Sequence, residues 1–184
     1  DEEEKLRDEV EKIVKKIEKA IEDLRRHAEK SVTDIRKVLK ELEDHIRESV
    51  KDAERFISED RSEESVERLV RKLERNLDEL RRRAEELKKR IDEDLERLKE
   101  LVRRLKEELE KMLRDLREKV RRLGTSEKLE KILREIERIV EKLKEDLDRL
   151  LKRYEDELRR LKEELERILD TYRRLLEELE RRLR

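Results

Sequence analysis

The chain has 184 residues, of which 60% are charged and 33% hydrophobic, and its 55 basic residues nearly balance its 56 acidic ones. It contains no Cys, which excludes a disulfide framework and thiolate chemistry, and it has no apolar run long enough for a membrane span or a signal peptide. A formal net charge of -1 gives no reason to expect nucleic acid or an anionic membrane as a partner.

The first predicted helix covers roughly residues 2–58, and a polar break follows it. This break, "SEDRSEES", interrupts the apolar pattern and supplies side chains that cap helix N-termini. Asp60 with Glu63 three residues later fits a capping box, and Ser62 is the alternative cap. The break therefore predicts that one helix ends and a second begins here.

The second predicted helix covers roughly residues 61–123, and the third covers roughly 126–183. Between them, Gly124 can adopt the left-handed conformation that ends a helix, and Ser126 can cap the next one. Loops this short force neighbouring helices to run antiparallel. The sequence therefore predicts an all-α fold, a single-chain, up-down-up antiparallel three-helix bundle.

The apolar residues repeat at a fixed interval, which argues against the disorder that composition alone would suggest. They recur in steps of three and four, and the whole pattern maps onto itself at a longer interval, as at Leu129, Leu147, Leu165 and Leu183. This interval of eighteen positions over five turns corresponds to the period of a straight helix, about 3.6 residues per turn. We therefore expect long, nearly straight helices and one rod-like domain over residues 1–184.

A few polar and aromatic residues near the core repeat at the same interval of eighteen positions. Folding the helices at their loops places these residues in two cross-sections, about 27 Å apart at about 1.5 Å per residue. A buried polar group without a partner costs about 1–3 kcal/mol, so grouping donors with acceptors is favourable. A slipped helix would leave polar atoms against leucines, so we expect these layers to specify helix register. The two layers are His27, Ser31, Asp94 and Tyr154, and His45, Ser49, Asn76 and Tyr172.

The first layer contains the residue types of a hydrolytic triad, namely His27, Ser31 and Asp94. The second layer has Asn76 where a triad needs an acid, and no Gly-rich oxyanion hole lies near either layer. Each layer offers one His and at most one Asp, which leaves a tetrahedral metal site two ligands short. We therefore expect no enzyme activity, no catalytic residues, no metal and no cofactor.

A pH response is the alternative role for the two histidines, because a buried His titrates near neutrality. Asp94 would favour the charged form of His27, whereas Asn76 offers His45 no charge. The two histidines are therefore expected to titrate differently if both lie in the core.

The repeated layering, the Glu, Lys and Arg surfaces, the "GTSEK" loop and the polar layers resemble computationally designed (de novo) helical bundles with buried hydrogen-bond networks. The resemblance covers the whole chain. It implies a thermostable scaffold that is soluble and has no cofactor, no evolved substrate and no natural localisation. Four residues depart from the leucine pattern, and we interpret them as shape-fitting in the core: Ala53, Phe56, Val66 and Met112.

Two other interpretations remain open. A natural coiled-coil spacer is less favoured, because the chain contains no Gln and little Ala. A helical interaction module would use an apolar helix face to bind a partner helix or a second copy. Three apolar stripes can close on one another, so we expect a monomer without partners, and a homo-oligomer is the alternative.

Overall fold

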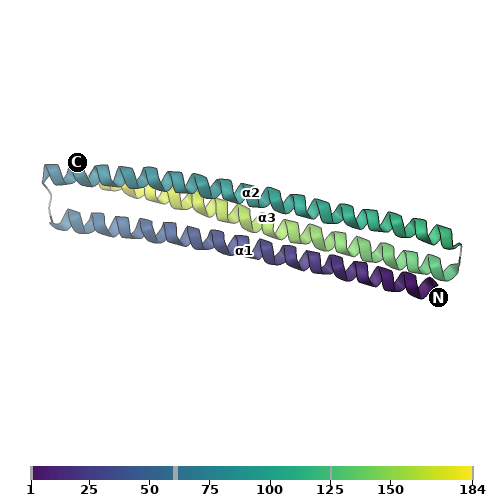
Figure 1. Cartoon of the computed structure of the whole chain (residues 1–184). Helices are drawn as coiled ribbons and strands as arrows, with labels where there is room; N and C mark the ends of the chain where they lie inside the picture. Colours follow the sequence, from purple (N-terminus) through teal and green to yellow (C-terminus); the bar gives the residue numbers. More distant parts are fainter. Residues whose placement is uncertain (1, 60–61, 125, 184) are drawn as a thin grey trace. The chain divides into compact units, whose positions relative to one another are not determined.

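The structure, a computed structural model, describes residues 2–59, 62–124 and 126–183. These ranges hold three α-helices and no strand (Figure 1). The all-α three-helix bundle that the sequence predicts is confirmed. The helices are α1 (Glu2–Glu59), α2 (Glu63–Leu123) and α3 (Glu127–Leu183).

Ser62 is the N-cap of α2. The amide of Ser65 donates to its hydroxyl oxygen at 3.4 Å, and the amide of Val66 donates to its carbonyl oxygen at 3.0 Å. These bonds satisfy amides that the first turn of a helix leaves without intrahelical partners. The other predicted cap, Asp60, lies outside the described residues. Capping by Ser62 explains why α2 begins at Glu63 rather than near residue 61.

Gly124 and Ser126 act as the sequence predicts. The backbone of Gly124 has φ +101°, a left-handed conformation that favours glycine, and its amide donates to the carbonyl of Arg121 at 3.3 Å. The Ser126 hydroxyl oxygen accepts from the amide of Leu129 at 3.1 Å, and its carbonyl accepts from the amide of Glu130 at 3.1 Å. Together they end α2 and start α3 within a few residues.

Gly124→Ala is expected to lower the free energy of unfolding by about 1 kcal/mol, because a Cβ at this φ is strained. Nothing lies within 4 Å of the position that a Cβ would occupy, so the cost comes from the backbone alone. Chemical denaturation followed by circular dichroism measures it. Gly124→Asn is the control and should cost less, since Asn tolerates the left-handed region. Equal stability of the alanine variant and the parent chain would contradict the assignment.

The three helices contribute to two compact units. Unit 1 comprises Asp1–Lys30 and Leu95–Asp156, and unit 2 comprises Ser31–Asp94 and Glu157–Arg184. Each unit therefore contains a segment of α1, a segment of α2 and a segment of α3.

The core of unit 1 consists of the apolar stripes of its three helical segments. Leu109, Val140 and Leu147 are fully buried there, and Ile136 and Tyr154 are 1% exposed. Burying a leucine side chain contributes about 1.5–3 kcal/mol relative to leaving it in water. These stripes come from all three helices, so the segments pack on one shared core.

In unit 1, ion pairs between α2 and α3 follow one antiparallel register. Lys106 pairs with Asp148, and Glu110 pairs with Lys144. The partners are four residues apart on each helix and follow in opposite order, as an antiparallel register requires. A third pair continues the same register, with Arg117 Nη2 and Glu137 Oε1 at 3.2 Å.

Unit 2 is built in the same way. Its core includes the fully buried residues Ile35, Ala53, Ala84 and Leu165. Two ion pairs join its α2 and α3 segments in the antiparallel register of unit 1: Lys88 Nζ with Glu166 Oε1 at 3.6 Å, and Asp92 Oδ1 with Lys162 Nζ at 3.0 Å.

Candidate functional site

Three of the four residues predicted for the second polar layer line one cavity in unit 2. This cavity lies between α1 and α2 and has a volume of about 390 Å³. The spacing of four residues puts His45 and Ser49 on one face of α1, and Asn76 faces them from α2. The remaining lining is mixed polar and apolar: Glu48, Asp52, Ala53, Phe56, Arg68, Leu69, Lys72 and Leu73.

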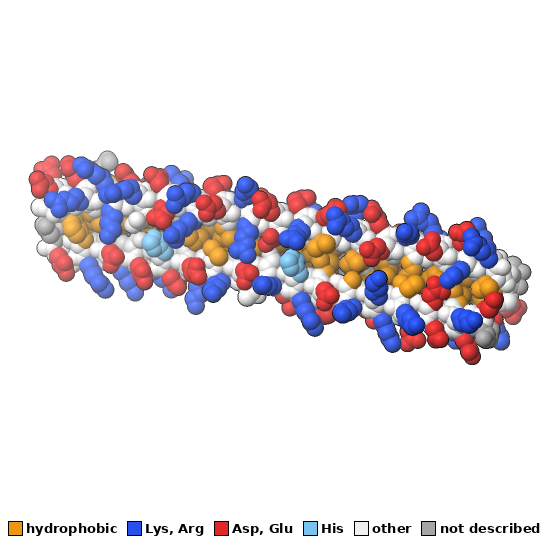
Figure 2. Space-filling model, viewed as in Figure 1, with side chains coloured by type: hydrophobic (Ala, Val, Ile, Leu, Met, Phe, Trp, Pro, Cys, Tyr) orange, Lys and Arg blue, Asp and Glu red, His pale blue; other side chains and the backbone are white. Residues whose placement is uncertain are grey.

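The prediction that the histidines lie inside the core is wrong, because His27 and His45 are both exposed. Both are visible on the surface in Figure 2, among the charged side chains. Each is followed directly by a buried apolar residue, Ala28 or Ile46. Successive residues of an α-helix are rotated by about 100°, so the histidine lies beside the core stripe rather than in it. A pH response that depends on buried histidines therefore loses its premise.

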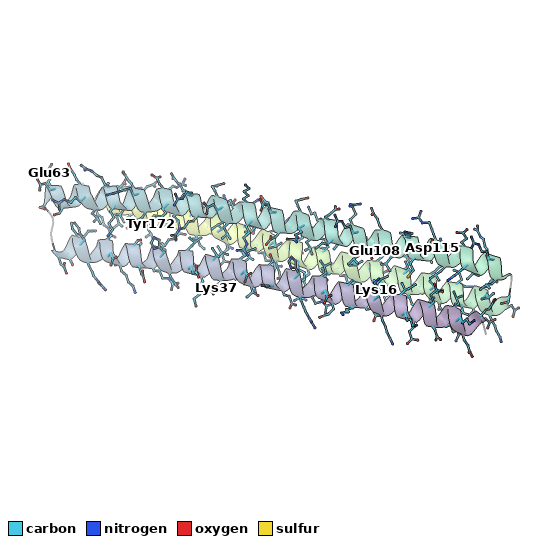
Figure 3. The ribbon with its side chains drawn as sticks, viewed as in Figure 1. Lys16, Lys37, Glu63, Glu108, Asp115 and Tyr172 are labelled. Carbon is cyan, nitrogen blue, oxygen red and sulfur yellow. The ribbon has the colours of Figure 1, made fainter. Side chains whose placement is uncertain are left out.

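Tyr172, the fourth predicted residue of this layer, is buried on α3 and is 3% exposed (labelled in Figure 3). Its hydroxyl has no hydrogen-bond partner of normal geometry among the described residues. Burial raises the pKa of Tyr172 above its ordinary value, and the neighbouring Ser49 side chain opposes part of this rise. Tyr172 is thus packed in the core, with its hydroxyl near the Ser49 side chain but without a hydrogen bond of normal geometry.

A spectrophotometric titration of the Tyr154→Phe variant isolates Tyr172, because the chain has only two tyrosines. We expect its phenol to ionise above the ordinary value of 10.0 in the folded protein and near that value in denaturant. The raised pKa means that the folded state disfavours the phenolate. Ionisation of Tyr172 therefore leaves the free energy of unfolding unchanged below pH ~10 and lowers it as the pH rises from there through the folded-state pKa. Ionisation at the same pH in both states would contradict the burial of this hydroxyl.

Ser31 and Asp94, two predicted members of the first layer, meet within unit 2. The Ser31 hydroxyl donates a hydrogen bond to the Asp94 carboxylate, and both residues are partly buried. An ion pair between Arg90 and Asp34, at 3.6 Å, joins the same two helices nearby. Ser31 donates directly to the acid, whereas a triad serine donates to a histidine. The contact thus lacks the serine–histidine hydrogen bond of a triad. What it does is join α1 to α2 in a defined register.

Tyr154, the aromatic residue of the first layer, lies in unit 1 and has a partner that the sequence prediction missed. Its hydroxyl donates to Glu29 Oε1 at 3.0 Å, and the Arg153 guanidinium carbon lies 5.4 Å from the centre of its ring. The sequence does contain a signal that the two tyrosines have different surroundings, because the position one repeat after Glu29 is Arg47. An arginine only donates hydrogen bonds, so the equivalent position cannot supply an acceptor for Tyr172.

The residues that the structure describes also bear on metal binding and on membrane insertion. No group of three or more His, Asp and Glu side chains among them is arranged to hold a metal ion. None of the three helices, over its described length, carries a stretch that is apolar enough to cross a bilayer.

Comparisons with known proteins identify a likeness of fold. No protein-family model matches this chain, and no curated protein matches it in sequence. Among solved structures, a "computationally designed three helix bundle" is similar over 99% of this chain and 93% of its own, with a TM-score of 0.61 and 20% sequence identity. At this identity the likeness concerns the fold alone: this chain has the three-helix-bundle fold of that designed protein.

Proposed function

We propose that this chain is a designed structural scaffold without enzymatic activity, whose sequence specifies one helix register. The main support for this proposal is that the ion pairs between α2 and α3 have the same antiparallel register in each of the two units. The charges themselves follow the sequence repeat, since Lys88 and Asp92 correspond to Lys106 and Glu110. A surface that is selected only for solubility does not require such matching.

The placement of these charges opposes slipped registers. A slip of α3 by one helical turn along α2 would remove Asp148 from Lys106. Depending on the direction, Lys144 or Lys152 would then lie opposite Lys106. Like charges that face each other across an interface are unfavourable, so either slip is penalised.

The polar contacts at the edge of the core support the same role. The Ser31–Asp94 hydrogen bond joins α1 to α2, and the Tyr154–Glu29 hydrogen bond joins α3 to α1. A helix shift would leave these partly buried polar atoms against apolar side chains. We infer that these side chains supplement the ion pairs in specifying register.

Charge exchange at one ion pair tests the register role. Lys144→Glu is expected to lower the free energy of unfolding by about 1 kcal/mol, because a Lys side chain that is only 23% exposed is replaced by an acid facing Glu110. Adding Glu110→Lys should restore most of the loss. Urea denaturation is the suitable measurement, since guanidinium salts would screen the charges. The control, Lys142→Glu, changes an exposed charge on the same helix and should have little effect. Failure of the double variant to recover would contradict the proposal.

A mass measurement tests the scaffold interpretation as a whole. We expect sedimentation to give the mass of a single chain, 22.9 kDa, and thermal unfolding to occur above about 90 °C. A mass of two chains would instead favour the alternative, a helical interaction module that self-associates.

A further inference from the structure

A second hollow in unit 2 differs from the polar cavity in being floored by apolar side chains. It lies between α1 and α3 and has a volume of about 540 Å³, within the usual range for small-molecule sites. Ile46 and Val50 contribute its floor from α1, and Ile168 and Leu175 contribute it from α3. We call this hollow the α1–α3 groove.

The core is locally open at this groove. Val50 is partly exposed, whereas Val32, the equivalent residue one sequence repeat earlier, is only 3% exposed. Ile168 and Leu175 are partly exposed as well. A ligand with an apolar tail can therefore remove hydrophobic surface from water here without displacing a core side chain.

The rim of the groove carries three basic side chains that are available to a ligand. Arg47, Lys51 and Arg167 all line it, and none of them makes an ion pair within the described ranges. Glu43 and Glu164 also line it, so the basic residues outnumber the acidic ones by one. Charge complementarity therefore favours an anionic head group.

A groove in unit 1 provides the contrast. It lies between α1 and α2, also has an apolar floor that includes Ile13 and Met112, and has a volume of about 610 Å³. Acidic and basic residues are equally numerous on its rim, and Lys16, Glu108 and Asp115 are labelled in Figure 3. It offers similar apolar surface without an excess of positive charge.

We propose that the α1–α3 groove binds a single-chain amphiphile that carries a carboxylate, such as a medium-chain fatty acid. The alkyl tail covers the apolar floor between the two helices. The carboxylate interacts with the basic rim, where an arginine side chain can donate paired hydrogen bonds to both carboxylate oxygens. This binding activity is independent of the scaffold role, because it requires only the folded chain.

Titration of decanoate into the full chain with labelled methyl groups tests the proposal by nuclear magnetic resonance. Saturable shifts are expected for the methyl groups of Ile46, Val50 and Ile168, and none for Ile13 in the unit 1 groove. The same tail with a trimethylammonium head should bind roughly tenfold more weakly or not at all, because it meets the basic rim with the wrong charge. Decanol should fall between the two.

The double variant Lys51→Gln/Arg167→Gln retains the apolar floor and should weaken decanoate binding roughly tenfold while leaving decanol binding unchanged. The matched control is Lys16→Gln/Lys111→Gln on the unit 1 groove, which should leave decanoate binding unchanged. Circular dichroism verifies that both variants fold. Absent saturation, equal affinity for the three head groups, or shifts centred on the unit 1 groove would each overturn the proposal.

Discussion

Leu147→Ala is expected to lower the free energy of unfolding by about 2–5 kcal/mol. Leu147 is 0% exposed in the core of unit 1. Removing its isopropyl group forfeits the transfer free energy of three carbon atoms and leaves a cavity that the packed helices can only partly fill. Denaturation in guanidinium chloride measures the change as a shift of the midpoint at constant slope.

Leu151→Ala is the matched control, because it is the same substitution one turn later on α3. Leu151 is only partly buried, so its truncation removes less buried surface and should cost clearly less. Equal losses for Leu147→Ala and Leu151→Ala would mean that the apolar stripe of α3 faces the core differently from the structure.

Tyr172→Phe should raise the free energy of unfolding by about 1 kcal/mol, whereas Tyr154→Phe should lower it by about 0.5–1.5 kcal/mol. The substitution is identical, and the two tyrosines occupy equivalent positions of the sequence repeat. The sign differs because the Tyr154 hydroxyl donates to Glu29, while the buried Tyr172 hydroxyl has no partner of normal geometry in the described chain. Replacing an unsatisfied hydroxyl by hydrogen removes a desolvation cost, and replacing a satisfied one removes a bond.

Thermal and chemical denaturation of the two phenylalanine variants and of their combination give these values. Destabilisation by both substitutions would show that Tyr172 is satisfied, for example by water. A further variant, Arg47→Glu, tests the same explanation. It places a carboxylate at the position equivalent to Glu29, the partner of Tyr154. It is expected to stabilise the parent chain but not the Tyr172→Phe variant, because only a hydroxyl can use the new acceptor.

Particular residues show how much the sequence alone predicts. Ser62, Gly124 and Ser126 are recognisable in the sequence because helix termini are decided by local chemistry, and each acts as predicted. The Ser31–Asp94 contact was also predictable, because short loops and helices of nearly equal length leave little freedom in register. The prediction that the two histidines lie in the core is wrong, because spacing alone does not distinguish a residue in the core stripe from one beside it.

The sequence by itself determined the three helices, their ends and their antiparallel order, because periodicity, caps and loop length act over a few residues at a time. Only the tertiary structure decided which polar side chains find partners. Tyr154 meets Glu29 across an interface, the equivalent Tyr172 finds no such acceptor among the described residues, and both histidines lie at the surface. These outcomes depend on rotations of a fraction of a turn and on which side chain a neighbouring helix presents. A pattern within one helix does not contain that information.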